Sequence, residues 1–268
     1  MNPLISVNLT THNRAHLLPG ALDSILEQSY SNLEIVIVDD CSQDNTSEIV
    51  HRYQQFDSRI KYIRNDENKK LGKSRNIAWQ ASGGKYIATM DDDDVWIDCD
   101  KLYKQVCILE KTSKNNVALV CSSIRFYRDE GSFDEQCVIR PKNLTYSILI
   151  GNGIIHTSTA VIRKTVLEEV GGFDEKLPRG VDSEFYRRCI VKHNYDVYFM
   201  TDITVAYRAY GNDRITPKTT RKDIKIEICN LVYLFQKYNI EFIKNPRALS
   251  KRLKQLLKNI MKLLRELL

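Results

Sequence analysis

The sequence lacks paired cysteines and long hydrophobic runs. Its seven cysteines are scattered, and no two of them form a Cys-x-x-Cys pair. This spacing argues against a disulfide framework and against a zinc site, and it favours reduced thiols. No apolar stretch approaches the length of a transmembrane helix, and the N-terminus shows no signal-peptide pattern. We therefore expect a cytoplasmic protein without a spanning segment.

The body of the chain also lacks an excess of charge of either sign. The net charge is +6, from 40 Lys and Arg against 34 Asp and Glu. Residues 247–268 hold seven of the basic residues and one acid, so the remainder carries 33 of each sign. A neutral body argues against a broad basic face, and we expect no nucleic-acid partner.

What the sequence does contain is a run of four aspartates after a short apolar segment. Residues 91–94 directly follow residues 86–90, which have the pattern of a buried strand. Carboxylates this close repel one another unless a positive charge holds them. At the end of a strand in an α/β sheet, such a density of oxygen ligands suits Mg²⁺ or Mn²⁺, commonly together with phosphates. Taken alone, the run is equally compatible with a solvated acidic segment.

Strand and helix patterns alternate through the first half of the chain. The pattern predicts strands at 4–10, 33–38, 61–64 and 86–90, and helices at 17–29, 46–55 and 73–81. This order predicts βαβ units and a mainly parallel sheet flanked by helices. Ligands bind beyond the carboxyl ends of such strands. Three polar loops fall there, at residues 10–13, 39–40 and 91–94.

The second half is less regular. The pattern predicts helices over 100–112 and 164–170, strands over 117–127 and 158–163, a polar turn region at 128–137, and a helix that opens near Asp182. No internal repeats or low-complexity linkers interrupt it. One domain with a C-terminal extension is the simplest division.

Six short motifs follow one another at residues 6–14, 38–40, 72–76, 90–94, 171–175 and 181–184. Together they resemble glycosyltransferase family 2, the inverting nucleotide-sugar transferases of the GT-A fold. Each motif is weak alone, but six in the same order argue against chance. Two of them depart from the family pattern. Thr10-Thr11-His12-Asn13 replaces the usual Pro-Thr-Tyr-Asn, and Val181-Asp182 replaces the usual Glu-Asp.

The resemblance implies a GT-A catalytic domain over residues 1–215 and a helical extension over 216–268. The nucleotide sugar would bind the part up to about residue 95, and the acceptor would bind residues 96–215. The implied reaction is inverting transfer from a UDP-sugar to a glycan or lipid-linked saccharide in surface polysaccharide biosynthesis, of O-antigen or capsule type, with Mn²⁺ or Mg²⁺. The alternative is a non-catalytic nucleotide-sugar or membrane-binding module that kept the fold.

Carried over by position, the resemblance also implies roles for single residues. Asp182 would be the general base, and Asp91 and Asp93 would act through the metal. Asp40 would accept from the uracil N3–H, Arg75 would face the diphosphate and Asp92 would reach the ribose. The nucleotide-sugar contacts would be Thr10, His12, Asn13, Asp40, Arg75 and Asp92, and further acceptor or diphosphate contacts would be His156, Arg208 and Arg214. Structural alternatives stay open, among them a strand-ending Asp40, a solvated Arg75, plain loop histidines and a helix N-cap at Asp182.

The reaction itself calls for these groups. Breaking a sugar–diphosphate bond leaves negative charge on the phosphate, which a divalent cation and an arginine stabilise. The attacking hydroxyl needs a carboxylate to take its proton. A single base opposite the leaving group gives inversion, whereas a double displacement needs a second, nucleophilic carboxylate. Phosphoryl transfer would need a phosphate-cradling glycine-rich loop, which residues 10–13 do not supply.

The last residues predict an amphipathic helix. Leucines and one isoleucine fall on one helical face over 249–268, and lysines and arginines, Arg252 among them, fall mostly on the other. This composition is typical of a helix that lies on an anionic membrane surface, so residues 247–268 predict a peripheral protein on the inner face of the cell membrane. The same apolar positions also fit a coiled-coil heptad, so homo-oligomerisation through this helix and packing on the protein's own body remain alternatives.

Overall fold

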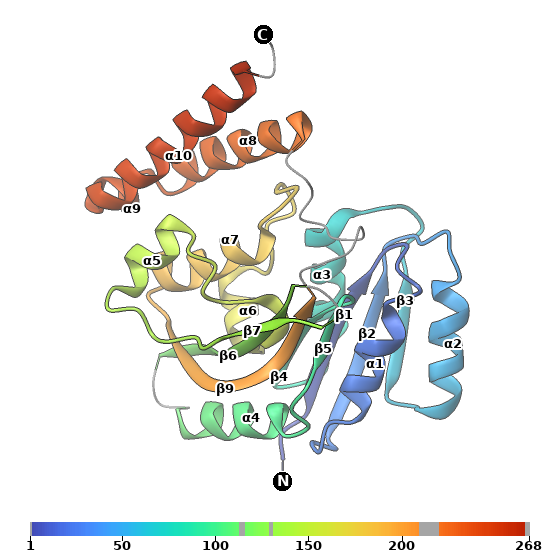
Figure 1. The fold of residues 1–268 in the computed structure, drawn as a ribbon. Helices are drawn as coiled ribbons and strands as arrows, with labels where there is room; N and C mark the ends of the chain where they lie inside the picture. Colours follow the sequence, from blue (N-terminus) through green and yellow to red (C-terminus); the bar gives the residue numbers. More distant parts are fainter. Residues whose placement is uncertain (1, 113–115, 129–130, 209–219, 266–268) are drawn as a thin grey trace.

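The computed structural model describes residues 2–112, 116–128, 131–208 and 220–265. Figure 1 shows a curled central sheet with helices on both faces, and a further layer of three helices, α8 to α10, across one end. Along the sheet the strand order is β3-β2-β1-β4-β8-β6-β9-β5, and β7 pairs with β6. The expected α/β fold with a helical extension is confirmed.

Four parallel strands form the first half of the sheet. They are β1 (Ile5–Thr11), β2 (Leu33–Asp39), β3 (Ile60–Arg64) and β4 (Tyr86–Asp91). The register aligns Thr10 with Asp91 on one side and Thr11 with Asp39 on the other. Because parallel strands end at the same edge of a sheet, the three polar loops predicted from the sequence meet there.

Helices cover both faces of these strands. On the face that contains Ile35 lie α1 (Leu18–Leu26) and α2 (Thr46–Phe56). On the face that contains Val36 lies α3 (Lys70–Gln80). A strand covered on both sides has no solvent-facing positions, which explains why β1 and β2 are buried throughout and why β2 consists largely of apolar residues.

The second half of the sheet mixes parallel and antiparallel pairs. β8 is antiparallel to β4 and β6, β5 is antiparallel to β9, and β6 runs parallel to β9. The strands are β5 (Asp94–Trp96), β6 (Val117–Tyr127), β7 (Phe133–Gln136), β8 (Val161–Arg163) and β9 (Asp196–Arg208). The helices are α4 (Lys101–Lys111), α5 (Leu144–Ile150), α6 (Lys164–Val170) and α7 (Val181–Arg187), which continues into a π-helical turn at Arg188–Lys192.

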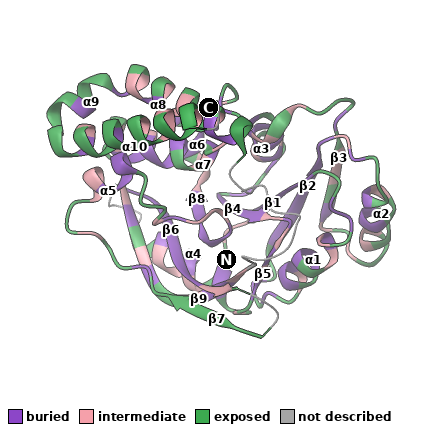
Figure 2. Cartoon of the chain, turned by 45° about the horizontal axis from the view of Figure 1, so that its top comes forward, coloured by how far each residue is buried: buried purple, intermediate pink, exposed green. Residues whose placement is uncertain are grey.

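Three details differ from the sequence predictions. The strand expected over 158–163 begins only at Val161, because the His156 carbonyl accepts from both the N–H and the hydroxyl of Thr159 and holds a 3-10 turn there. The turn region at 128–137 contains β7, an edge strand of polar composition that is exposed at all four positions (Figure 2). The long strand β9 was not predicted at all.

The C-terminal extension packs on the body through α8 (Arg221–Lys237), α9 (Asn239–Lys244) and α10 (Pro246–Arg265). Apolar residues of α8 to α10 form one cluster with the end of α5, and its buried members are Leu149, Ile150, Leu234, Tyr238, Phe242 and Ala248. In Figure 1, α8 and α10 lie side by side above α5 and α7. Within the described residues no helix is both long and apolar enough to cross a membrane.

A buried carboxylate anchors the extension to α7. Glu184 is 0% exposed, and its carboxylate accepts from the side chain of Arg188, the first residue of the π-helical turn that continues α7. From α8, the Lys237 ammonium lies 2.7 Å away, and the Tyr238 hydroxyl just beyond donates at 2.8 Å. Lys237 also pairs with Asp174 in the preceding loop at 2.5 Å. Since charges buried without partners are costly, this network fixes α8 against the helix that carries Asp182.

Candidate active site

A cleft of about 650 Å³ opens at the carboxyl edge of the parallel strands. It lies where β1, β2 and β4 end, between α3 and the start of α7. The residues that line it are Thr10, Thr11, His12, Arg14, Asp40, Asn68, Lys70, Leu71, Ser74, Arg75, Asp91, Asp92, Asp93, Pro178, Arg179, Gly180, Asp182 and Tyr207. The structure therefore brings together eight of the predicted site residues.

The acidic run has a geometry that suits a divalent cation. Carboxylate oxygens of Asp91, Asp93 and Asp94 lie within 4.8 Å of one another. Asp94 is buried, and its Oδ2 accepts from the Ser158 hydroxyl at 2.5 Å, whereas its Oδ1 has no hydrogen-bond partner in the described part of the chain. Burial, and then the charges of Asp91 and Asp93, raise the pKa of Asp94 well above its ordinary value. A cation would satisfy the orphaned oxygen and offset the repulsion, so the donor set fits Mg²⁺ or Mn²⁺ and includes a third aspartate.

Arg14 supplies positive charge on the opposite side of the run. Its Nη1 lies 2.8 Å from Asp92 Oδ1 and 3.1 Å from Asp93 Oδ2. Burial, which the charge of Arg14 offsets only in part, raises the pKa of Asp92 to about 6. The sequence contains Arg14 at the end of the first loop motif, but without the fold nothing indicated that it reaches the aspartates 78 residues later.

Arg75 of α3 joins the acidic run to the predicted base. Its Nη2 donates to Asp91 Oδ1 at 2.6 Å, and its Nη1 forms an ion pair with Asp182 Oδ1. The Arg75 side chain is 6% exposed, so the solvated alternative is wrong. Asp182 lies in the first turn of α7, whose N-cap is Gly180 at a φ of 71°, so Asp182 is not the N-cap. Its carboxylate instead faces the cleft.

Asp40 is buried and already holds the neighbouring loop. It accepts from the Asn65 side chain at 2.8 Å and from the backbone N–H groups of Lys69 and Lys70 at 2.7 and 2.9 Å. An ionised carboxylate has about four lone-pair directions, so one acceptor position is left for a ligand donor. Thr10 lines the same part of the cleft.

His12 and Asn13 take different positions after β1. His12 lines the cleft, and its Nε2 lies 3.1 Å from the side-chain nitrogen of Asn68. Asn13 has a φ of 54°, donates from its backbone to Ser42 and accepts from the Gln43 N–H at 2.7 Å. Asn13 is not among the residues that line the cleft, so in this structure it braces two loops.

The predicted late contacts are only partly placed. His156 does not line the cleft, but its ring centroid lies 5.9 Å from that of Tyr207, which does. Burial lowers the pKa of His156, and within the described ranges its Nε2 has no hydrogen-bond partner. Arg208 is the last residue of β9, and Arg214 lies outside the described residues. Tyr207, the residue before Arg208 in β9, was not predicted as a site residue, and the fold brings it to the cleft.

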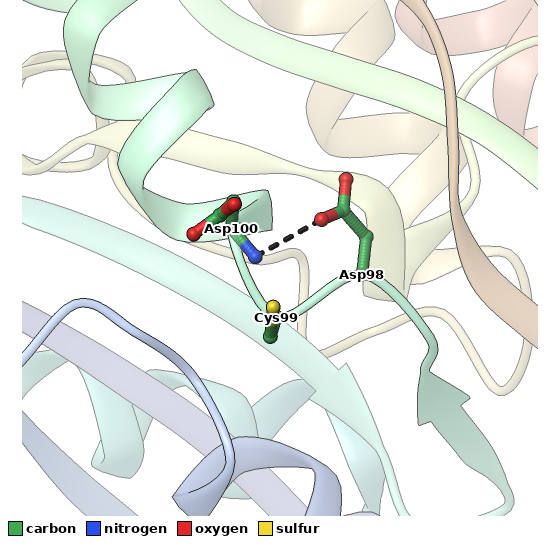
Figure 3. Close-up of side chains that lie close together, drawn as sticks. All are labelled: Asp98, Cys99 and Asp100. Carbon is green, nitrogen blue, oxygen red and sulfur yellow. Dashed lines mark hydrogen bonds between the residues drawn. The ribbon is translucent and has the colours of Figure 1, made fainter.

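A second acidic group lies where α4 begins, away from the cleft. Figure 3 shows Asp98, Cys99 and Asp100, whose potential ligand atoms lie within 4.8 Å of one another. Asp98 accepts from the Asp100 N–H at 3.0 Å and from Lys104 Nζ at 2.6 Å, and Asp100 accepts from the Ser29 hydroxyl at 2.6 Å. Protein donors already engage these carboxylates, and we assign them no ligand.

Two curated relatives cover most of the same region. The putative teichuronic acid biosynthesis glycosyltransferase TuaG of Bacillus subtilis (strain 168) is 30% identical over 210 residues, which are 78% of this chain and 81% of the relative. The UDP-Glc:alpha-D-GlcNAc-diphosphoundecaprenol beta-1,3-glucosyltransferase WfgD of Escherichia coli is 31% identical over 164 residues, which are 61% of this chain and 62% of the relative.

Two solved structures share the fold. The S. aureus TarS fragment 1–349 in complex with UDP-GlcNAc superposes with a TM-score of 0.66 at 18% identity, over 86% of this chain and 65% of that one. The mannosyltransferase PcManGT from Pyrobaculum calidifontis, in complex with GDP-Man and Mn²⁺, gives 0.64 at 21% identity, over 97% and 76% of the two chains. These likenesses concern the fold alone.

The family model described as glycosyl transferase family 2 matches residues 6–171, more than half of the chain. The match includes the first loop motif and the aspartate run, which contribute residues to the cleft, and it ends at the start of the 171–175 motif. The chain therefore belongs to glycosyl transferase family 2, and it is a glycosyltransferase.

Proposed function

We propose that the chain transfers a sugar, with inversion, from a UDP-sugar to a saccharide acceptor in surface polysaccharide biosynthesis. The observation that carries the proposal is the bridge made by Arg75 between Asp91 and Asp182. It places the candidate base and the candidate metal ligands on one wall of one cleft, although they are 91 residues apart in the sequence. A non-catalytic module would have no need to keep the base beside the metal ligands.

The nucleotide would occupy the edge formed by β1 and β2. Asp40 has one acceptor position left for the uracil N3–H, and Thr10 and His12 line the space beside it. Asp92 would accept from the ribose on the side where Arg14 holds it. Asp91, Asp93 and Asp94 would hold Mn²⁺ or Mg²⁺, which when bound neutralises charge on the departing diphosphate.

The chemical step needs one carboxylate. The acceptor hydroxyl oxygen forms a bond to the anomeric carbon while the bond from that carbon to the diphosphate oxygen breaks. The electron pair leaves with UDP, and the hydroxyl proton passes to Asp182. Arg75 orients Asp182 and adds positive charge beside the leaving diphosphate, where negative charge grows in the transition state. Because Asp182 acts as a base and forms no glycosyl bond, the configuration inverts.

The acceptor is proposed to be lipid-linked, with the enzyme held at the inner face of the cell membrane by α10. The relative WfgD carries a diphosphoundecaprenol-linked sugar in its name. In α10 the apolar residues divide between two sides. One set is half-buried toward the body, and the other stands exposed: Leu253 (42%), Leu257 (61%), Met261 (53%) and Leu264 (49%). Lysines flank the exposed set, as anionic lipid would require.

The sequence prediction for this helix needs one correction. Arg252 was expected among the polar, solvent-facing residues, but it is only 8% exposed and donates to the carbonyl of Leu149 at 2.9 Å. α10 is therefore not an independent amphipathic helix, because its first turns are built into the body. Only the later turns present a free apolar side to lipid or to a second copy.

Substituting Asp182 tests the base. We expect Asp182→Asn to lower transfer by a factor of about 10²–10⁴, because the amide keeps the shape but cannot take a proton. Binding of UDP with Mn²⁺, followed by calorimetry, should stay within a few-fold of the unchanged protein. Asp66→Asn removes an exposed carboxylate outside the cleft and serves as the control. Near-normal transfer by Asp182→Asn would show that another group takes the proton.

Removing the metal tests the aspartate cluster. EDTA should abolish hydrolysis of the UDP-sugar and its transfer, and added Mn²⁺ or Mg²⁺ should restore both. Asp94→Asn should raise the Mn²⁺ concentration needed for half-maximal activity at least tenfold, because the orphaned oxygen would no longer be charged. Asp100→Asn, in the second acidic group, should leave that concentration unchanged. Full activity in EDTA contradicts the metal assignment.

Vesicle binding tests α10. The double substitution Leu257→Asp with Met261→Asp should release the protein from phosphatidylglycerol vesicles in a sedimentation assay, because it puts charge on the exposed apolar side. Phe56→Asp alters a hydrophobic residue on α2 that is even more exposed, at 87%, and should leave binding intact. If the double variant still sediments, α10 does not bind lipid. If it instead turns a dimer into a monomer, the helix is a self-association surface.

A further inference from the structure

A second cavity, of about 210 Å³, lies between α7 and the C-terminal helices. It adjoins the cleft, because Arg179 and Gly180 line both. On its other sides it is lined by Ser183 and Arg187 of α7 and by residues of α8 and α10. The cavity is smaller than a site for a drug-sized ligand, and its size suits a small polar group.

Two buried guanidinium groups face this cavity, one from each side. Arg252 of α10 donates to the Leu149 carbonyl at 2.9 Å and to the Gln255 side chain at 2.8 Å, and both partners are neutral. Arg187 of α7 is 2% exposed, and its Nε has no hydrogen-bond partner among the residues that the structure describes. Burial, and then the charge of Arg187, lower the pKa of Arg252 to about 10. The two cations therefore repel each other across the cavity.

The carboxylates near Arg187 and Arg252 already form hydrogen bonds or ion pairs with other residues. Glu184 helps to stabilise Arg187 electrostatically, but its oxygens accept from Arg188, Lys237 and Tyr238. Asp223 pairs with Arg179 at 2.6 Å. Glu227, at the rim, is exposed and accepts from Asn259. Within the described part of the chain, neither Arg187 nor Arg252 has an ion-pair partner, an arrangement that is costly unless an anion enters.

We propose that this cavity binds the diphosphate of a sugar-diphosphate-lipid acceptor and so presents the sugar to Asp182. The inference rests on the proposed function and adds the site that recognises the acceptor. Guanidinium groups bind phosphate oxygens through pairs of parallel hydrogen bonds. The Nε of Arg187 has no acceptor among the described residues and could form such a bond. The lipid chain would leave along the side where α10 exposes its apolar residues.

Helix geometry relates the two sites. Ser183 and Arg187 are four residues apart on one side of α7, and Asp182 lies on the adjacent side, toward the cleft. Five residues of helix span about 7.5 Å along the axis, which corresponds to a single sugar and its first phosphate. The sugar that receives the transferred residue would therefore be the one attached directly to the diphosphate.

Two isosteric substitutions that change the charge of the cavity in opposite directions test the proposal without removing buried side chains. Gln255→Glu places a carboxylate beside Arg252, and Glu227→Gln removes the carboxylate at the cavity rim.

The acceptors are N-acetylglucosaminyl diphosphate on a short alkyl chain and the corresponding alkyl glycoside without phosphate. Both dissolve without membranes, so binding through α10 does not enter the measurement. Lys258→Gln, on α10 away from the cavity, changes the net charge by the same amount as Gln255→Glu.

With the diphosphate acceptor, we expect Gln255→Glu to raise KM about tenfold and Glu227→Gln to lower it about threefold, with kcat unchanged. With the alkyl glycoside, neither KM should move, and Lys258→Gln should affect neither acceptor. Equal KM values for the two acceptors, or no opposite shifts, would overturn the proposal. Metal-dependent hydrolysis of the UDP-sugar, measured in each variant, distinguishes failure of this proposal from failure of the proposed function. If the unchanged protein does not hydrolyse the UDP-sugar, the result contradicts the donor site and not the diphosphate site.

Discussion

The repulsion between closely spaced carboxylates is the constraint on which the site depends. Five acidic side chains, Asp91 to Asp94 and Asp182, converge on one edge of the sheet, and most are wholly or partly buried. Two arginines make this convergence tolerable: Arg14 holds Asp92 and Asp93, and Arg75 holds Asp91 and Asp182. Burial and the charges of Asp91 and Asp93 raise the pKa of Asp94, and a divalent cation would offset this repulsion.

The same principle extends from the cleft to the C-terminal helices. Glu184 lies two residues after Asp182 and is buried among cationic and hydroxyl donors from α8 and the π-helical turn. The extension is therefore attached to the helix that carries the candidate base. On the adjacent side of α7 the balance reverses, since Arg187 and Arg252 are buried and neither forms an ion pair with a carboxylate of the described residues. One short helix thus separates a region short of positive charge from a region short of negative charge.

The amino-acid pattern was sufficient for the parallel half of the fold and for the convergence of Asp40 and Asp91, because buried strands are local signals. Asp182 was identified only through the resemblance to the family. The pattern missed Asp94 and Arg14, whose roles arise from burial and from contacts between distant loops. It missed β9, a long strand of mixed composition whose pairing with β6 shifts register. The pattern predicted a solvent-facing Arg252, because helical periodicity treats a helix as isolated. It cannot show that Arg252 donates to the Leu149 carbonyl in the last turn of α5.

The central claim is that Asp182, held beside the metal ligands by Arg75, acts as a base and not as a nucleophile. The anomeric configuration of the product tests it most directly. Proton NMR of the product formed from an α-linked UDP-sugar should show a β-linkage in the first turnovers, before any further reaction. A product with the donor's α-configuration would contradict the account, because retention requires a double displacement or front-face attack that a single proton-accepting carboxylate does not provide.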